Sequence, residues 1–276
     1  MITLRGASIA ALLATSVLSA QDIQFCTVEP TVVEQRFLRL RPKNDQRAES
    51  LRRIFAEAGC NSDSWTEQKI KRSKLSNLIC TLPGTSERSV IVSAHYDKVD
   101  EGEGAIDNWS GAALLPSLYQ SLSNVPRTLT YVFLLTTDEE KGLIGSTGFV
   151  RSLSKEQLRA IVADVNIDSV GFPGATNVWH RRADPALFNA AVLVAGALKI
   201  PMKGVNVDQV GDSDSHPFAD KHVPVIDFHS LTSATLPILH TPKDVVAIHD
   251  PASYYETFRL ISAFVAYLDV APPPAK

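Results

Sequence analysis

The chain has few cysteines and almost no excess of charge of either sign. Only 3 of its 276 residues are cysteine, which excludes a fold built mainly on disulfide bonds. The formal net charge of −3 gives no electrostatic reason to expect nucleic acid or an anionic membrane as a partner. Internal repeats and long linkers are lacking too. The remaining composition, 45% hydrophobic and 21% charged, is typical of a globular protein with a sizeable core.

Long hydrophobic runs are missing except near the N-terminus. Residues 7–18 are apolar, too few to span a bilayer, and Arg5 gives the segment a basic start. We therefore predict a signal peptide over residues 1–20, cleaved near Ala20, and a secreted or periplasmic protein. An uncleaved apolar N-terminus or a buried helix is the alternative. The sequence does not fix the cleavage site. A small residue usually stands two places before the last residue of a signal peptide, and this chain has Leu18 there.

The three cysteines allow at most one disulfide within the chain. They are Cys26, Cys60 and Cys80. In an oxidising compartment we expect one disulfide and one free thiol. Cys80 lies in an apolar run, so a buried free thiol at that position is an alternative. The sequence does not choose among the three possible pairings.

Helix-like and strand-like segments alternate along the chain. Hydrophobic periodicity predicts helices over residues 45–59, 109–122, 155–162, 184–198 and 251–269. It predicts strands over residues 65–70, 77–82, 89–95, 129–136, 162–168 and 223–228. This order predicts an α/β fold with a mixed, mostly parallel central sheet and helices on both faces. We expect a single domain over residues 21–270 and a disordered Pro-rich tail over residues 271–276.

Acidic residues and histidines follow the predicted strands, at the points where those strands end. They are His95, Asp97, Asp138, Glu139, Glu140, Asp168 and, in a later loop, His240. Open parallel sheets bind ligands at the carboxyl ends of their strands, so these side chains should meet at one edge. Each alone is most simply a turn residue or a solvated surface group. Their coincidence, and a set of imidazole and carboxylate donors, favours a zinc site.

Five segments in order along the chain carry a resemblance to a known family. They are His95-Tyr96-Asp97, Gly104-Ala105-Ile106-Asp107-Asn108-Trp109-Ser110-Gly111, Asp138-Glu139-Glu140-Lys141-Gly142-Leu143-Ile144-Gly145-Ser146, Asn166-Ile167-Asp168-Ser169-Val170-Gly171 and His240-Thr241-Pro242-Lys243-Asp244. Together they resemble the motifs of secreted bacterial zinc aminopeptidases. These enzymes belong to the co-catalytic zinc exopeptidase clan, of phosphorylase/hydrolase-like fold, which also holds glutaminyl cyclases. The resemblance runs from about Ser76 to Asp244.

The resemblance implies two zinc ions per chain and five metal ligands. His95 and Asp168 would bind one zinc, and Glu140 and His240 would bind the other. Asp107 would bridge both ions. Two zinc ions lower the pKa of a water molecule and polarise a carbonyl group, which is what amide hydrolysis needs at neutral pH.

The same resemblance implies residues that act on protons. Glu139 would be the general base, and Asp97 would orient His95 through a hydrogen bond. The sequence alone does not decide which of Glu139 and Glu140 faces the metal. The resemblance also implies a cis peptide bond between Asp107 and Asn108.

One segment departs from the family pattern. Residues 213–218 resemble the family's Ser-Asp-His segment, but the histidine, His216, stands one place late. Asp214 remains a candidate acid behind the site, while His216 is expected only to line the pocket. The other histidines are expected on the surface or in packing: His180, His222, His229 and His249. Among them His229 is the main rival of His240 as a ligand, because it too ends a predicted strand.

The leading hypothesis is an aminopeptidase that releases single residues from peptides. A glutaminyl-peptide cyclotransferase with one zinc is the alternative within the clan. A carboxypeptidase or amidohydrolase with an added dimerisation domain is disfavoured, because no spare segment of that size lies between Glu140 and His240. A non-catalytic binding ectodomain should have lost metal ligands that this chain keeps.

We expect a peptide substrate, and no membrane association once the signal is removed. Side-chain preference and oligomeric state are not readable from the sequence.

Overall fold

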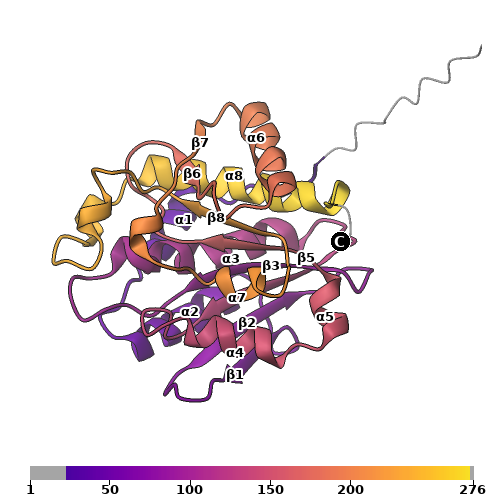
Figure 1. Ribbon diagram of the computed structural model, residues 1–276, viewed down its shortest axis with the longest axis horizontal. Coiled ribbons are helices and arrows are strands. Elements are labelled where there is room, and N and C mark those ends of the chain that lie inside the picture. The colour runs from indigo at the N-terminus through magenta and orange to yellow at the C-terminus, as the bar shows by residue number, and fades with distance from the viewer. Residues whose placement is uncertain (1–22, 274–276) are drawn as a thin grey trace, which may run out of the picture.

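The computed structural model describes residues 23–273, which form one eight-stranded sheet flanked by helices (Figure 1). The predicted signal peptide over residues 1–20 and residues 274–276 of the predicted tail lie outside the described residues. Among residues 23–273, no helix combines the length and the apolar character needed to cross a membrane.

The elements follow one another in the predicted alternation. The strands are β1 (Trp65–Lys69), β2 (Ser76–Leu82), β3 (Ser89–His95), β4 (Thr130–Thr136), β5 (Ile161–Ile167), β6 (Thr176–Val178), β7 (Met202–Gly204) and β8 (Val225–His229). The α-helices of the described part are α1 (Pro30–Phe37), α2 (Asn44–Glu57), α3 (Gly111–Ser123), α4 (Ile144–Ser152), α5 (Lys155–Ala160), α6 (Pro185–Leu198), α7 (His216–Ala219) and α8 (Pro251–Val270). Short helical segments are η1 (Ala105–Ser110), η2 (Asp208–Val210), η3 (Leu236–Ile238) and η4 (Val246–Ile248).

The sheet is mixed, with a parallel centre, as the sequence predicts. The strand order is β1-β2-β4-β3-β5-β8-β6-β7. Pairs β3–β4, β3–β5, β5–β8 and β6–β7 are parallel. The antiparallel pairs are β1–β2, β2–β4 and β6–β8. Because β4, β3, β5 and β8 run in the same direction, the loops that follow them meet at one edge of the sheet.

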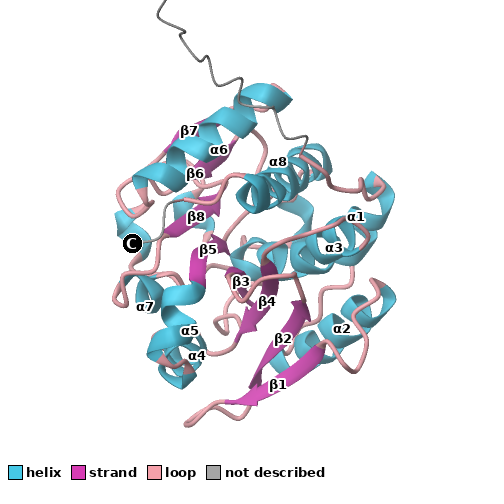
Figure 2. Cartoon of the chain, turned by 90° about the vertical axis from the view of Figure 1, so that its right-hand side faces the viewer, coloured by secondary structure: helices cyan, strands magenta, loops and turns pink. Residues whose placement is uncertain are grey.

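Helices cover both faces of the sheet (Figure 2). The larger core joins the sheet to α1, α2, α3, α6 and α8, with Trp109 and Phe133 among its fully buried aromatic side chains. A smaller core under α4, α5 and α7 contains Phe149 and Phe218. The strands in the middle of the sheet are therefore covered on both faces, and every residue of β5 is buried, including the polar residues Asp164 and Asn166.

The helix predicted over residues 109–122 starts differently from the prediction. It begins at Gly111, because residues 105–110 form η1, inside which Asp107 and Asn108 leave helical geometry. The peptide bond between Asp107 and Asn108 is cis, which confirms the expectation from the family resemblance. Asp107 thus lies in an irregular segment just before α3.

The disulfide joins Cys60 and Cys80, and Cys26 is free and exposed. One disulfide with one free thiol is what we expect for three cysteines. The alternative that Cys80 is a buried free thiol is wrong. The bond ties the segment after α2 to β2, near the edge of the sheet.

Candidate metal centre

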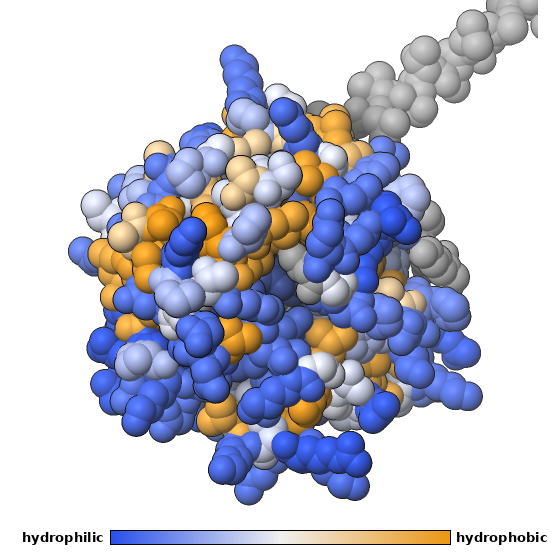
Figure 3. All heavy atoms as spheres, turned by 60° about the vertical axis from the view of Figure 1, so that its left-hand side comes forward, coloured by the Kyte–Doolittle hydropathy of each residue, from blue (hydrophilic) through white to orange (hydrophobic). Residues whose placement is uncertain are grey.

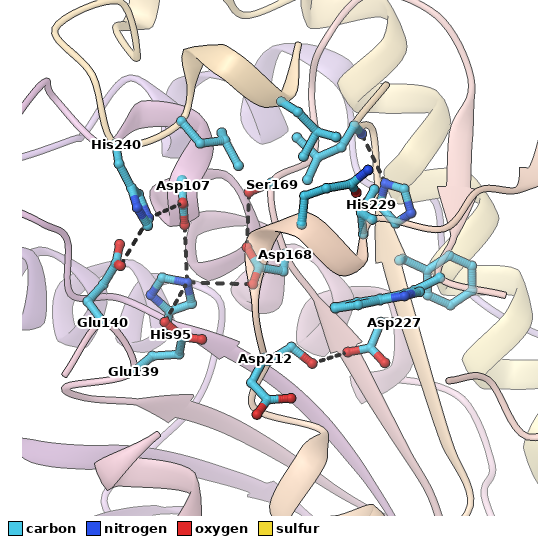
Figure 4. A pocket seen from close by; sticks show the side chains of 18 of the residues that line it. His95, Asp107, Glu139, Glu140, Asp168, Ser169, Asp212, Asp227, His229 and His240 are labelled. Carbon is cyan, nitrogen blue, oxygen red and sulfur yellow. Dashed lines mark hydrogen bonds and ion pairs between the residues drawn. The ribbon is translucent and has the colours of Figure 1, made fainter. Parts of the chain in front are cut away.

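The ends of four parallel strands bring the predicted ligands together (Figure 4). His95 ends β3, Glu140 follows β4, Asp168 follows β5 directly and His240 lies in the loop after β8. The fifth residue, Asp107, comes from η1, which enters the same space from the side of α3. All five side chains lie at the edge of the sheet where the sequence predicts a site.

These residues form two overlapping groups. One consists of His95, Asp107 and Asp168, the other of Asp107, Glu140 and His240. Within each group, the possible ligand atoms all lie within 4.8 Å of one another. The grouping matches the two sets that the resemblance implies, with Asp107 as the shared member.

Asp107 turns one carboxylate oxygen toward each histidine. Its Oδ1 lies 3.3 Å from Nε2 of His95, and its Oδ2 lies 3.1 Å from Nε2 of His240. The side chain is only 9% exposed. A carboxylate in this position suits two cations, because its negative charge offsets the repulsion between them.

The adjacent glutamates have different partners. Oε2 of Glu140 lies 3.1 Å from Nε2 of His240, and its Oε1 is buried without a hydrogen-bond partner among residues 23–273. Glu139 belongs to neither group; its Oε2 is 3.9 Å from Nε2 of His95, and it lines the pocket. A buried carboxylate oxygen without a hydrogen-bond partner lowers the stability of the fold, and a bound metal ion would give it a partner. Glu140 therefore suits the role of a metal ligand. Glu139 is then free to carry a proton.

The crowded acids and imidazoles shift one another's pKa values. Burial alone would lower the pKa of His95, but the charge of Glu139 and the nearby aspartates raise it well above its ordinary value. Hydrogen bonds to Asp107 and Glu140 raise the pKa of His240 to about 10. Burial also raises the pKa of Glu139 to about 10. The side chains therefore hold protons at neutral pH that a divalent cation would displace.

The donor set fits zinc. Each group offers one imidazole nitrogen and carboxylate oxygens from two residues, which are common ligands of catalytic zinc. Three protein ligands at each ion would leave room for water or substrate, as catalytic sites require. The unpaired Oε1 of Glu140 adds an acceptor that has no donor among the described residues.

The side chain of Asp97 contacts the turn of the two glutamates and makes no hydrogen bond to His95, which differs from the role that the resemblance implies. Its Oδ1 lies 3.6 Å from Nδ1 of His95, longer than a hydrogen bond, while its backbone oxygen is 3.3 Å from the same nitrogen. Its carboxylate instead accepts hydrogen bonds from the backbone N–H groups of Glu139 and Glu140, at 3.1 and 3.3 Å. Asp97 therefore links the end of β3 to the turn that carries both glutamates.

Two further residues hold the segment that carries Asp107, and the sequence analysis missed both. Arg47 is fully buried on α2, and its guanidinium donates to the backbone oxygens of Tyr96 and Gly104. Asp244 accepts hydrogen bonds from the backbone N–H groups of Ile106 and Asp107. The sequence does contain a signal for Asp244, because this residue ends the segment that begins with His240. It contains none for Arg47, which has the pattern of an ordinary helix residue.

Asp214 and His216 lie in different environments. Asp214 is buried, accepts a hydrogen bond from Thr136 and has a pKa raised to about 6 by burial. His216 has 43% of its side chain exposed and pairs with Asp212 and Asp220. It does not line the pocket, so the expectation of a pocket-lining role is wrong.

The rival histidine, His229, is not part of either ligand group. It is buried in the pocket wall, where Nδ1 accepts from the N–H of Leu231 and Nε2 lies 3.2 Å from the oxygen of Val205. Burial lowers its pKa to about 4. His249 stacks on Phe37 in the core, as a packing role predicts.

The ligand groups open into a cavity of about 740 Å³. Figure 3 brings forward the side of the molecule on which the loop of His240 lies, and this face is hollowed near its centre. The cavity continues from the ligands to a wall that includes Trp179, Val207, Leu231 and Leu236. The cavity is therefore large enough to hold a small organic ligand, and its apolar wall suits an apolar side chain of that ligand.

Comparison with known proteins agrees with this site. A family model described as peptidase family M28 matches residues 77–265, which include all five candidate ligands. Aminopeptidase YwaD of Bacillus subtilis (strain 168) is 30% identical over 163 residues, 57% of this chain and 36% of that protein. The chain thus spans about a third of the length of this relative.

Two solved structures share the fold at low identity. The LapA aminopeptidase of Legionella pneumophila superposes with a TM-score of 0.75 and 18% identity, covering 96% of this chain and 77% of LapA. A glutaminyl cyclase from an Acidobacteriales bacterium superposes with a TM-score of 0.72 and 17% identity, covering 87% of this chain and 93% of the cyclase.

Proposed function

Because the chain belongs to peptidase family M28, we propose that it is a two-zinc aminopeptidase that removes the N-terminal residue from peptides. The observation that carries the proposal is Asp107, whose two carboxylate oxygens face the histidines of two ligand groups. Similarity to aminopeptidase YwaD supports the type of reaction. Residues 21–270 would form the catalytic unit.

In this proposal, His95 and Asp168 would hold one zinc, Glu140 and His240 would hold the other, and Asp107 would be a ligand of both. Bound zinc polarises the substrate carbonyl and lowers the pKa of the attacking water. The surrounding protein keeps these ligands in place through hydrogen bonds to the backbone near them. Such outer contacts fix ligand orientation and commonly affect metal affinity.

Glu139 acts as the general base. Its carboxylate takes a proton from the water as the water oxygen bonds to the carbonyl carbon. It then gives this proton to the nitrogen of the leaving amine as the C–N bond breaks. Glu139 lines the pocket, with its Oε2 3.9 Å from Nε2 of His95, and belongs to neither ligand group, so its carboxylate is available for this transfer.

A glutaminyl-peptide cyclotransferase with one zinc is the second candidate. The structural likeness to a glutaminyl cyclase covers 93% of that chain, so the two are of similar extent. Two complete ligand groups, however, are more than a single zinc needs. This difference makes metal content and substrate choice the deciding observations.

We also propose that the protein is exported to the periplasm or the medium. The apolar N-terminal segment supports a signal peptide. The disulfide between Cys60 and Cys80 fits an oxidising compartment. Detection of the processed protein outside the cytoplasm, with a new N-terminus near Gln21, would test this.

The experiment for the activity uses zinc-loaded protein with aminoacyl-4-nitroanilides, their N-acetylated forms and a peptide with N-terminal glutamine. An aminopeptidase cleaves the free anilides and spares the acetylated ones, because it requires a free N-terminus. A cyclase would instead release ammonia from the glutamine peptide without breaking a peptide bond. Protein that holds zinc but neither cleaves the free anilides nor releases ammonia from the glutamine peptide would contradict both candidates.

A further inference from the structure

The pocket holds a buried carboxylate that the proposed reaction does not use. Asp227 lies on β8, lines the same cavity as the metal ligands and is 3% exposed. Figure 4 shows it on the opposite side of Asp168 from His240. It is therefore placed away from the reacting centre but within reach of a bound ligand's side chain.

Asp227 has hydrogen bonds but no cation beside it. Its Oδ1 accepts from Asn166 at 3.0 Å and Ser213 at 2.7 Å, and its Oδ2 accepts from Ser215 at 2.9 Å. In the described part of the chain, no Lys, Arg or His forms an ion pair with it. A carboxylate offers about four acceptor positions, so one position on Oδ2 is left.

The basic residue whose charge acts on Asp227 already has a partner. Arg182 lowers the pKa of Asp227 through its charge but forms no ion pair with it, and its guanidinium pairs with Asp212 at 2.5 Å. It also lies 4.2 Å over the ring of Trp179. Burial raises the pKa of Asp227, which is the cost of keeping this carboxylate from water without a counter-ion.

One wall of the cavity that Asp227 lines is apolar. Trp179 and Leu231 belong to this wall and are both buried. Lysine and arginine side chains combine an apolar stem with a charged end group, so they match an apolar channel that ends at an acid. An acid at the base of a specificity pocket is also how trypsin selects basic residues.

We propose that Asp227 makes this pocket selective for N-terminal residues with a cationic side chain, lysine or arginine, whose end group binds the Asp227 carboxylate. The proposal rests on the proposed aminopeptidase function for its substrate. The amine or guanidinium donates to the open position on Oδ2 and supplies the missing positive charge. A leucine side chain would fill the apolar channel but leave the acid uncompensated.

The first test compares lysine with norleucine, whose side chain has the same four carbons without the amine. We expect wild-type kcat/KM for the lysyl anilide to exceed that for the norleucyl anilide by at least tenfold, equal to ~1.4 kcal/mol. In Asp227→Asn this ratio should fall to about one, because the lysyl substrate loses the partner of its charge. The matched control is Asp164→Asn, a buried aspartate on β5 that accepts from Ser93 and does not line the cavity.

The second test measures binding and does not need turnover. The indole N–H resonance of Trp179 reports binding of lysine amide and norleucine amide to the metal-free protein. Tighter binding of lysine amide that is lost in Asp227→Asn supports the proposal even if no anilide is cleaved, which would refute only the proposed function.

Equal binding of the two amides by the wild type would overturn the proposal. A loss of both amides together in the variant would also overturn it, because Asp227 would then bind the α-amino group. The proposal is equally wrong if Asp212→Asn, not Asp227→Asn, removes the lysine preference.

Discussion

Asp244 holds Asp107 by its backbone: Oδ2 of Asp244 accepts the N–H of Asp107 at 3.1 Å, and Oδ1 accepts the N–H of Ile106 at 2.7 Å. Asp244 stands four residues after His240 in the same loop. The loop that supplies one ligand therefore also positions the carboxylate that both ligand groups share. The two segments lie far apart in the sequence, and the side chain of Asp244 joins them directly.

Asp244→Asn should weaken zinc binding without removing a ligand. An asparagine side chain has one acceptor oxygen, so it can satisfy only one of the two N–H groups. We expect zinc affinity or kcat/KM to fall by ~10–100-fold, the usual effect of losing an outer partner. Competition with a fluorescent chelator measures the affinity. The exposed acid Asp220 serves as the control, since Asp220→Asn should change neither quantity; an equal loss there would remove the specific role of Asp244.

Glu139→Gln and Glu140→Gln should have different effects. The first keeps every proposed ligand and removes only the proton acceptor, so kcat should fall by ~10²–10⁴-fold while zinc content stays the same. The second alters a ligand, so zinc affinity should fall together with activity. Metal analysis beside steady-state kinetics separates the two. The opposite pattern would reverse the roles of the two glutamates, and two active variants would place the chemistry elsewhere.

Zinc should bind in a ratio of about two per chain, and more weakly as the pH falls. The raised pKa values of His95 and His240 mean that both imidazoles hold a proton at neutral pH, and each must lose it to bind a metal. Titration calorimetry in buffers of different ionisation enthalpy measures the released protons. A limit of one zinc at saturation would favour the cyclase alternative.

Loss of the disulfide should destabilise the fold by about 3 kcal/mol, the loop-entropy value for the 20-residue separation of Cys60 and Cys80. Cys60→Ser with Cys80→Ser removes the bond without leaving a new thiol. Chemical denaturation of the zinc-free proteins compares the two. Thiol titration of the native wild type should find one reactive group, Cys26; three would mean that the bond does not form.

Acid should destabilise the protein through His229. Its pKa of about 4 lies below the ordinary value near 6.5, so the fold favours the neutral imidazole. The resulting stability is complete above pH 6.5 and is lost as the pH falls toward 4, by about 3 kcal/mol in full. His229→Gln should show a smaller loss of unfolding free energy between pH 7 and 4 than the wild type. A histidine proton resonance that titrates near 6.5 at this residue would contradict the prediction.

The strands and the ligands were predictable because each depends on a local pattern. The apolar run over residues 129–136 needed only its composition to be assigned, and β4 covers Thr130–Thr136. His95, Asp168 and His240 stand at strand ends or in a recognisable segment, so their meeting followed from the direction of the strands. Most of the missed elements lack such signals, since β6 and β7 have three residues each and α4 contains Gly145 and Gly148. The helix α1 is missed as well, although Pro30 at its start is a helix signal.

The contacts that support the site depend on three-dimensional neighbours and could not be read in advance. Arg47 lies on a helix whose other face is exposed, and only the folded structure brings its guanidinium to the oxygens of Tyr96 and Gly104. The disulfide partner of Cys80 likewise depends on where α2 ends relative to β2. Asp227 ends up in the pocket because β8 lies beside β5, a pairing between segments distant in sequence.

The spread of the five ligands along the chain has a consequence for folding. The chain between His95 and His240 is long and contains most of the sheet. Bringing these two residues together closes a long loop, which costs conformational entropy. Folding of the sheet has already lost that entropy before zinc binds. Zinc that binds this arrangement acts as a cross-link between the centre of the sheet and the exposed loop of His240. Without it, that loop is held mainly by the contacts of Asp244, and it becomes the part of the protein from which amide hydrogens exchange and proteases gain entry first.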